Sequence, residues 1–177
     1  FVYDNWGMLL CCAGILGGVV AGIISDRVFH SRRGPVAAIL YAAMGISAIA
    51  LVFLYTTPVV GWLVVFMSMA VIGVHGMLSG TASMDFGGRK NVGVAVGIID
   101  GFVYAGTAVM SITYGFLLPD DTNAEVAANP DNWISWPLAM IPMAFIGFLL
   151  ATRVWNAKPK KHAQAPAPTD ETKPSTP

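Results

Sequence analysis

Charged residues are scarce in this sequence. They make up 11% of its 177 residues, whereas 55% of the residues are hydrophobic. A soluble domain carries roughly a quarter charged residues, so the composition excludes an ordinary soluble protein and indicates an integral membrane protein. The formal net charge is zero, which gives no indication of nucleic-acid binding.

Cysteines and catalytic motifs are nearly absent as well. Cys11 and Cys12 are adjacent in an apolar run, and because adjacent cysteines rarely pair, we interpret them as small helix residues rather than a redox site. The sequence contains neither H-E-x-x-H nor G-x-S-x-G. An intramembrane aspartyl protease needs two aspartates within the membrane, but Asp4 lies at the outer edge. We therefore expect no enzyme, no metal site and no cofactor.

Long apolar segments dominate instead, and each is near the length of about 20 residues that an α-helix needs to cross the hydrocarbon core. They predict an all-α integral membrane fold with one transmembrane region over residues 1–156. Residues 157–177 are rich in Pro, Lys, Ala and Thr and predict a disordered cytoplasmic tail. The five expected spans are residues 6–25, 35–56, 59–80, 91–118 and 133–155.

Basic residues are missing from one side of this arrangement. With five crossings, all ten Lys and Arg residues fall on one side, and the opposite side holds only acidic charges. By the positive-inside rule the basic side is cytoplasmic. We therefore expect a multi-pass protein of the inner (plasma) membrane of a bacterium, with its N-terminus outside and its C-terminus in the cytoplasm.

The segment 91–118 combines an apolar composition with one polar stripe. Five polar side chains follow one another at spacings of 4, 3, 4 and 3 residues. At about 100° per residue they fall within a narrow strip of one helix face. Lipid does not solvate such a strip, so we expect it to face protein or water and to line a solute pathway. The stripe consists of Asp100, Tyr104, Thr107, Ser111 and Tyr114.

Asp100 is the strongest candidate for function on this stripe. It lies nine residues after Asn91, which is about 13 Å along the helix axis and close to the middle of a hydrocarbon core about 30 Å thick. At that depth a carboxylate can bind a proton, a cation, or a hydroxyl or amine of a substrate. The alternative is a buried carboxylate bonded to a neighbouring helix for structure alone. We favour function because an intramembrane charge is costly; Tyr104 is a weaker candidate because tyrosine also packs as plain core.

Three further residues are candidates close to this stripe. His75, near the inner end of segment 59–80, either shares the cavity or carries a proton at physiological pH. A lone helical histidine is more often hydrogen-bonded to a neighbour, and we favour that interpretation. Gly93 and Gly97 form a small-xxx-small pair that allows a neighbouring helix to come close, as a gate or as a packing contact.

The loop between the first two segments concentrates charge. It reads Gly22-Ile-Ile-Ser-Asp26-Arg27-Val-Phe-His-Ser-Arg32-Arg33-Gly-Pro. Gly22 allows close approach to a neighbouring helix. Asp26 lies at a helix C-terminus, where the dipole disfavours an anion, so it needs a basic or helix-N-terminal partner. The alternative is a solvated basic loop that only sets topology.

This pattern resembles the loop signature of the major facilitator superfamily, which occurs between helices 2 and 3 and, in a weaker form, between helices 8 and 9. The spacing is two residues longer than the commonest form and is similar to the organophosphate:phosphate antiporter branch, which includes the glycerol-3-phosphate and hexose-phosphate transporters. A second stretch agrees with that branch: Asp85-Phe-Gly-Gly-Arg89-Lys90-Asn-Val-Gly93, then Gly97 and Phe102-Val-Tyr104-Ala-Gly106.

The resemblance covers residues 1 to about 156 and implies that the five helices correspond to helices 8 to 12, the C-terminal part of the fold. The first residue is Phe1 rather than Met, and no basic leader is present. We therefore expect a fragment of a longer protein that lacks helices 1 to 7. Asp85, Arg89 and Lys90 then form either an inner network at the start of segment 91–118 or a solvated loop.

The implied function is secondary active transport of a small polar solute by alternating access. The solute is an organic phosphate or another organic anion, and inorganic phosphate or a proton is the coupling ion. Substrate identity does not carry over securely, because the branch places its main phosphate-binding basic residues on helices outside this chain, and it has a small residue near the position of Asp100. A solute sensor without transport and a proton-coupled carrier of a different solute remain as alternatives. The expected partners are the solute, the bilayer and the missing N-terminal helices, without nucleic acid.

Overall fold

The computed structural model describes residues 1–120 and 122–158, with the side chain of Arg89 left out. Every regular element in this part of the chain is helical, and five helices are long and apolar enough to cross a membrane. The predicted all-α integral membrane fold with five transmembrane helices is therefore confirmed. Nearly all of the predicted disordered tail, from residue 159 on, lies outside the described residues.

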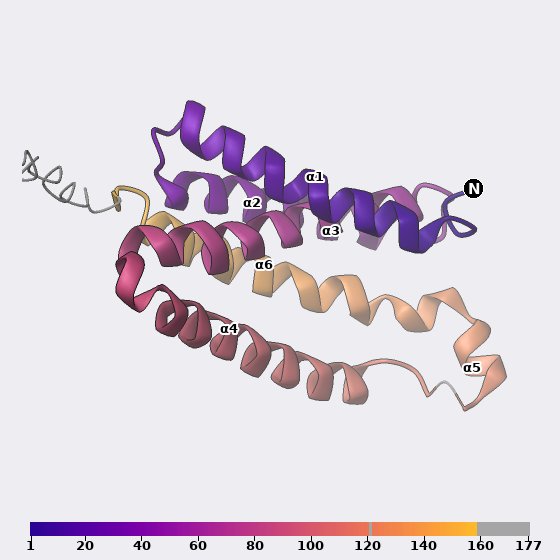
Figure 1. Cartoon of the computed structure of the whole chain (residues 1–177). Coiled ribbons are helices and arrows are strands. Elements are labelled where there is room, and N and C mark those ends of the chain that lie inside the picture. The colour runs from indigo at the N-terminus through magenta and orange to yellow at the C-terminus, as the bar shows by residue number, and fades with distance from the viewer. Residues whose placement is uncertain (121, 159–177) are drawn as a thin grey trace, which may run out of the picture.

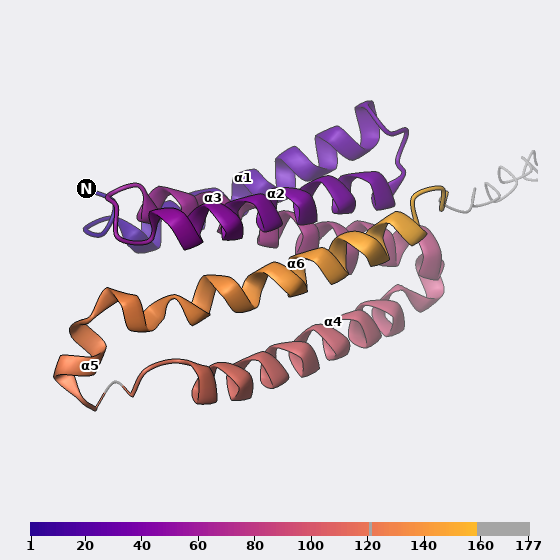
Figure 2. The same ribbon diagram turned by 180° about the vertical axis from the view of Figure 1, so that it is seen from behind.

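Successive long helices run in opposite directions (Figures 1 and 2). A tight loop joins the first two, and a 3-10 turn follows the short α5. In chain order the elements are α1 (Trp6–Arg27), α2 (Arg33–Leu54), α3 (Val60–His75), the π-helical η1 (Gly76–Ala82), α4 (Ser83–Leu117), α5 (Ala124–Ala128), η2 (Pro130–Trp133) and α6 (Ser135–Arg153).

Helix α4 is interrupted at Gly88. The backbone there has φ 67° and ψ 172°, a conformation that is open essentially to glycine alone. The chain reverses direction at this point (Figure 1), so one apolar span runs over Val60–Gly88 and the next over Lys90–Leu117. The helix expected over residues 59–80 therefore continues for about two further turns, because no residue before this glycine stops it.

Replacing Gly88 with alanine is expected to lower the free energy of unfolding by ~1–3 kcal/mol, because a Cβ forces strain on the reversal. The matched control is Gly115→Ala, since Gly115 lies within continuous helix and a Cβ there meets no atom within 4 Å. The measurement is the melting temperature of the purified protein in detergent. Equal melting temperatures for the two variants would show that the reversal does not depend on the glycine conformation.

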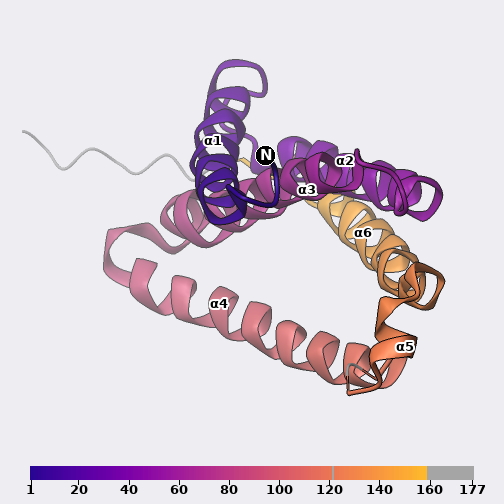
Figure 3. The same cartoon turned by 90° about the vertical axis from the view of Figure 1, so that its right-hand side faces the viewer.

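Helix α2 lies at the centre of the packed part of the bundle, where it contacts α1, α3 and α6. Helices α1 and α3 meet closely at Gly17 and Gly73, where an added Cβ would run into backbone atoms of the opposite helix. Helices α2 and α6 meet where the ring of Tyr41 covers Gly147. Helix α4 is different: none of its span Lys90–Leu117 is buried, and it lies to one side of the other helices in Figure 3.

The two ends of the bundle carry opposite charges. The end with the α1–α2 loop and the Gly88 reversal, which we call the basic end, holds Arg27, Arg32, Arg33, Lys90 and Arg153. The end with the N-terminus and α5, which we call the acidic end, holds Asp4, Asp120, Glu125 and Asp131. The described part of the acidic end contains no Lys or Arg side chain, so the fold keeps the two signs of charge apart.

Candidate functional site

Asp100 lies where α4 passes η1. It is half-buried, and its Oδ1 accepts a hydrogen bond of 2.6 Å from the Oγ of Ser79. Ser79 is only 7% exposed and lies in the middle of the π-helical segment. A hydrogen bond to a charged group contributes about 1.5–3 kcal/mol. The pair therefore links α4 firmly to the preceding span, and the sequence reasoning missed Ser79 because its apolar surroundings give no sign of a π-helix.

The rest of the polar stripe does not gather on one neighbour. Tyr114, nearer the acidic end, donates from its hydroxyl to the carbonyl oxygen of Trp136 at 3.2 Å. Tyr104, Thr107 and Ser111 are exposed, on a side of α4 that no other described element covers. The structure thus places both ends of the stripe against other elements and leaves its middle open.

His75 is deeper in the membrane span than expected. Because the helix continues to Gly88, His75 lies near the middle of Val60–Gly88 and not near its inner end. Its side chain is exposed in the described part of the chain, and its bond to a neighbouring helix stays a prediction.

His75 and Ser79 line one pocket of about 190 Å³ between α2, α3, η1 and α4. Tyr41 of α2 contributes the third polar side chain, which the sequence reasoning did not single out. This pocket therefore brings together an imidazole, a hydroxyl and a phenol at about the same depth in the bundle as Asp100. The apolar lining residues are Met44, Val71, Val74, Leu78, Ile99 and Val103.

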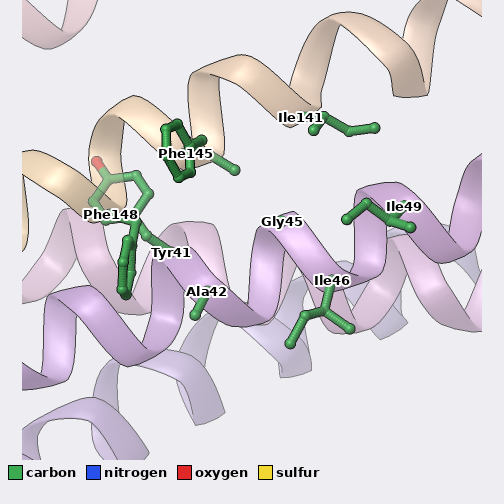
Figure 4. A pocket seen from close by; sticks show the side chains of 9 residues that line it. Tyr41, Ala42, Gly45, Ile46, Ile49, Ile141, Phe145 and Phe148 are labelled. Carbon is green, nitrogen blue, oxygen red and sulfur yellow. The ribbon is translucent and has the colours of Figure 1, made fainter.

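Two neighbouring pockets are apolar. One, of about 160 Å³, lies between α2, α3, α4 and α6 and includes five methionines in its walls. The other, of about 260 Å³, lies between α2 and α6, and the side chains labelled in Figure 4 show apolar walls apart from the hydroxyl of Tyr41. A solute site needs a few convergent polar groups, so the pocket with His75 and Ser79 is the better candidate.

At the basic end, Arg33 joins two acidic residues from different helices. Its Nη1 donates to Oδ1 of Asp26 at 2.7 Å, and its Nε donates to Oδ2 of Asp85 at 2.8 Å. Its Nη1 also donates to the Oγ of Ser25 at 2.8 Å. The side chain of Arg33 is 9% exposed, so two carboxylates and a hydroxyl compensate a nearly buried cation. We call Arg33, Asp26 and Asp85 the Arg33 network.

Helix dipoles do not favour this arrangement. Asp26 lies in the last turn of α1, and Arg33 is the first residue of α2. Each charge therefore has the unfavourable sign for its helix end, and the ion pair offsets both penalties. The basic partner of Asp26 comes from the next helix of the same loop.

The loop between α1 and α2 adopts an uncommon backbone to make these contacts. His30 and Ser31 both have positive φ, at 52° and 61°, which is rare outside glycine. Ser31 donates from its Oγ to Oδ1 of Asp26 at 3.0 Å, and Arg32 donates from its Nε to the carbonyl oxygen of Phe29 at 3.1 Å. Arg32 thus stabilises the loop itself and takes no part in an ion pair among the described residues.

Of the inner network expected at the start of segment 91–118, the structure describes the side chains of Asp85 and Lys90 but not that of Arg89. Asp85 belongs to the end of the span Val60–Gly88, and it pairs with Arg33, which is 52 residues away in the chain. Lys90 opens the following span and is exposed, as is Arg27. No local pattern predicts the contact between Arg33 and Asp85, because it depends on where the Gly88 reversal places the two helix ends.

Three glycines expected at close helix contacts have open surroundings. A Cβ added at Gly22, Gly93 or Gly97 would meet no atom within 4 Å in the described part of the chain. The close approach of α1 occurs one to two turns earlier, at Gly17. A small residue permits a close contact, but the crossing point of two helices decides where it forms.

The described residues contain no group of three or more His, Cys, Asp or Glu side chains that could hold a metal ion. Cys11 and Cys12 are unpaired and exposed on α1. The two groups of polar side chains considered below are the Arg33 network and the Asp100 site, which we define as Asp100 with Ser79 and His75.

Comparison with known proteins relates the chain to a transporter. It is similar to the glycerol-3-phosphate transporter of Bacillus subtilis (strain 168), with 30% identity over 149 residues. The match covers 81% of this chain and 31% of the length of that transporter, so the chain spans about a third of the relative that it matches. No family model matches the sequence, and no solved structure matches it.

Proposed function

The chain belongs to the major facilitator superfamily of transporters, and from this premise we propose that it forms the C-terminal part of a secondary active carrier for a small polar solute. Its five apolar helices make it an integral membrane protein. The similarity to a glycerol-3-phosphate transporter favours an organic phosphate as the solute, or another organic anion, and a transporter rather than an enzyme.

The observation that carries the proposal is the Asp100 site. A carboxylate in an apolar span is costly and is usually retained for use. Here only one of its oxygens accepts a bond from a described residue, and the adjoining pocket adds His75 and Tyr41. The exposed middle of the stripe, at Tyr104, Thr107 and Ser111, extends this polar surface toward the acidic end.

Asp100 is unsuited to bind a phosphate group, because two negative charges repel each other. We assign it instead to a hydroxyl group of the solute, or to a proton that accompanies the solute. The phosphate requires cations that the Asp100 site does not contain. They belong, in this proposal, to the helices that complete the carrier, and His75 contributes one only when it is protonated.

The orientation follows from charge. The basic end faces the cytoplasm and the acidic end faces outward, because basic residues accumulate on the cytoplasmic side of bacterial inner-membrane proteins. The Arg33 network then lies at the cytoplasmic mouth, where it holds the α1–α2 loop against the end of Val60–Gly88. We propose that it acts as a gate, which closes this mouth while the three charges are paired and opens when they part.

Solute flux tests the proposed function. The full-length protein, reconstituted into phosphate-loaded vesicles, is expected to take up labelled glycerol 3-phosphate and to leave unphosphorylated glycerol outside. Uptake driven by a proton gradient in vesicles without phosphate would identify a proton-coupled carrier. Saturable binding of the solute without any flux would show that the protein is a solute sensor and not a transporter.

A further inference from the structure

The π-helical segment η1 interrupts an otherwise α-helical span of 29 residues. A π-turn holds one residue more than an α-turn, so the side chains after it are set back by about 100° relative to a continuous α-helix. Two hydroxyls satisfy carbonyl groups of the widened turns: Thr81 donates to the carbonyl oxygen of Met77 at 2.7 Å, and Ser83 donates to that of Leu78 at 3.3 Å. Such segments occur frequently at functional sites.

Two polar contacts depend on this rotation. Ser79, within η1, bonds Asp100 at 2.6 Å, and Asp85, three residues after η1, bonds Arg33 at 2.8 Å. If the segment were α-helical, the side chain of Asp85 would turn by about 100° relative to the residues before η1, and by roughly half of that relative to Ser79. One of the two contacts would then break, so both contacts exist together only while η1 is π-helical.

The surroundings of η1 leave room for such a change. A Cβ at Gly76 or Gly80 would meet no atom within 4 Å, so the backbone at both positions is loosely surrounded in the described chain. The pocket lined by His75 and Ser79 also adjoins the segment. A solute group that enters this pocket therefore reaches the hydroxyl that bonds Asp100.

We propose that Ser79 is the positioning residue of the Asp100 site and that η1 couples this site to the Arg33 network. This inference rests on the proposed role of Asp100 in solute binding. A hydroxyl of the solute donates to Oδ2 of Asp100 while Ser79 holds Oδ1 in place. Segment η1 then relaxes to an α-helix, which keeps the contact of Ser79 with Asp100 and gives up the contact of Asp85 with Arg33. The relaxation turns the side chain of Asp85 away from Arg33. The α1–α2 loop then separates from the end of the span Val60–Gly88. The coupling is reciprocal, since parting of the Arg33 network in turn favours binding of the solute at the Asp100 site.

The first test measures uptake kinetics of the full-length protein in vesicles with labelled glycerol 3-phosphate. Ser79→Ala is expected to raise KM about tenfold while the maximal rate changes less than twofold, because the carboxylate loses the group that orients it. Ser79→Thr keeps a hydroxyl and is expected to stay within twofold of the natural protein. If Ser79→Ala does not fold, Ser79→Cys, with a weak donor of similar size, is expected to raise KM severalfold.

The second test measures the basic end directly. Spin labels at Val28→Cys and Met84→Cys, which are both exposed and lie beside the network, report the distance between the α1–α2 loop and the end of the span Val60–Gly88. Cys11 and Cys12 are replaced with serine in this background. Glycerol 3-phosphate is expected to shift the distance by several ångströms in the natural protein and in Ser79→Thr, but not in Ser79→Ala.

The outcomes separate the two proposals. If Asp100→Asn abolishes uptake while Ser79→Ala leaves both KM and the solute-dependent distance unchanged, the coupling through η1 is overturned and the role of Asp100 stands. If Asp100→Asn leaves uptake intact, the role of Asp100 fails, and the positioning role of Ser79 fails with it. An equal loss of activity in Ser79→Ala and Ser79→Thr overturns the positioning role, because it indicates a packing effect.

Discussion

Asp100→Asn is expected to lower solute uptake by the full-length protein by tenfold or more. Asparagine keeps the size of the side chain and still accepts a bond from Ser79, so the packing of α4 on η1 is preserved. It removes the charge, which weakens a bond to a solute hydroxyl, and it removes the proton site. Labelled glycerol 3-phosphate uptake into vesicles at equal protein amounts measures the effect.

Asp120→Asn is the matched control for this experiment. Asp120 is exposed at the acidic end, where the Oγ1 and backbone N–H of Thr122 donate to its carboxylate and lower its pKa. Its neutralisation removes the same charge far from the Asp100 site, and uptake is expected to stay within twofold. If both variants transport equally well, the stripe on α4 is no solute pathway.

Arg33→Met is expected to lower the free energy of unfolding by about 2 kcal/mol. Loss of one partner from a fully buried ion pair destabilises by about 3–5 kcal/mol. The effect here is smaller because the side chains of Asp26 and Asp85 are 58% and 21% exposed, so water solvates them in part once the guanidinium is gone. The melting temperature of the purified protein in detergent measures it.

Two comparisons make this prediction specific. Arg32→Met is the control, because Arg32 bonds only a loop carbonyl oxygen, and its effect is expected to stay below about 0.5 kcal/mol. The double variant Arg33→Met, Asp85→Asn is expected to recover part of the lost stability, since it no longer leaves the less exposed carboxylate without a cation. A double variant less stable than Arg33→Met alone would contradict an ion-pair network.

The two ends of the bundle have different stabilising contacts. At the acidic end the hydroxyl of Tyr55 donates to Oδ1 of Asp131 at 2.6 Å, which ties the α2–α3 turn to η2, and this bond raises the pKa of Tyr55. At the basic end the Arg33 network joins the α1–α2 loop to the span before Gly88. The span Lys90–Leu117 of α4 runs between these two ends and has no buried residue.

The depths of Asp100 and His75 within their membrane spans show what can be predicted from the sequence. The expectation that Asp100 lies well inside its span rests on counting from the start of the segment, and the structure starts that span at Lys90, one residue earlier. The same counting misplaced His75, because the end of its helix depends on the backbone at Gly88. Two adjacent glycines in a polar stretch indicate a break, but they do not tell which residue adopts a positive φ.

The amino-acid sequence by itself determined the membrane class of this protein, its five helices and the polar stripe with Asp100. These properties follow from hydropathy, length and helical periodicity, which act locally along the chain. Only the tertiary structure decided that Ser79 bonds Asp100 and that Arg33 joins Asp26 to Asp85. Both contacts join residues far apart in the chain, and their geometry depends on a π-turn and on one glycine conformation that hydropathy does not register.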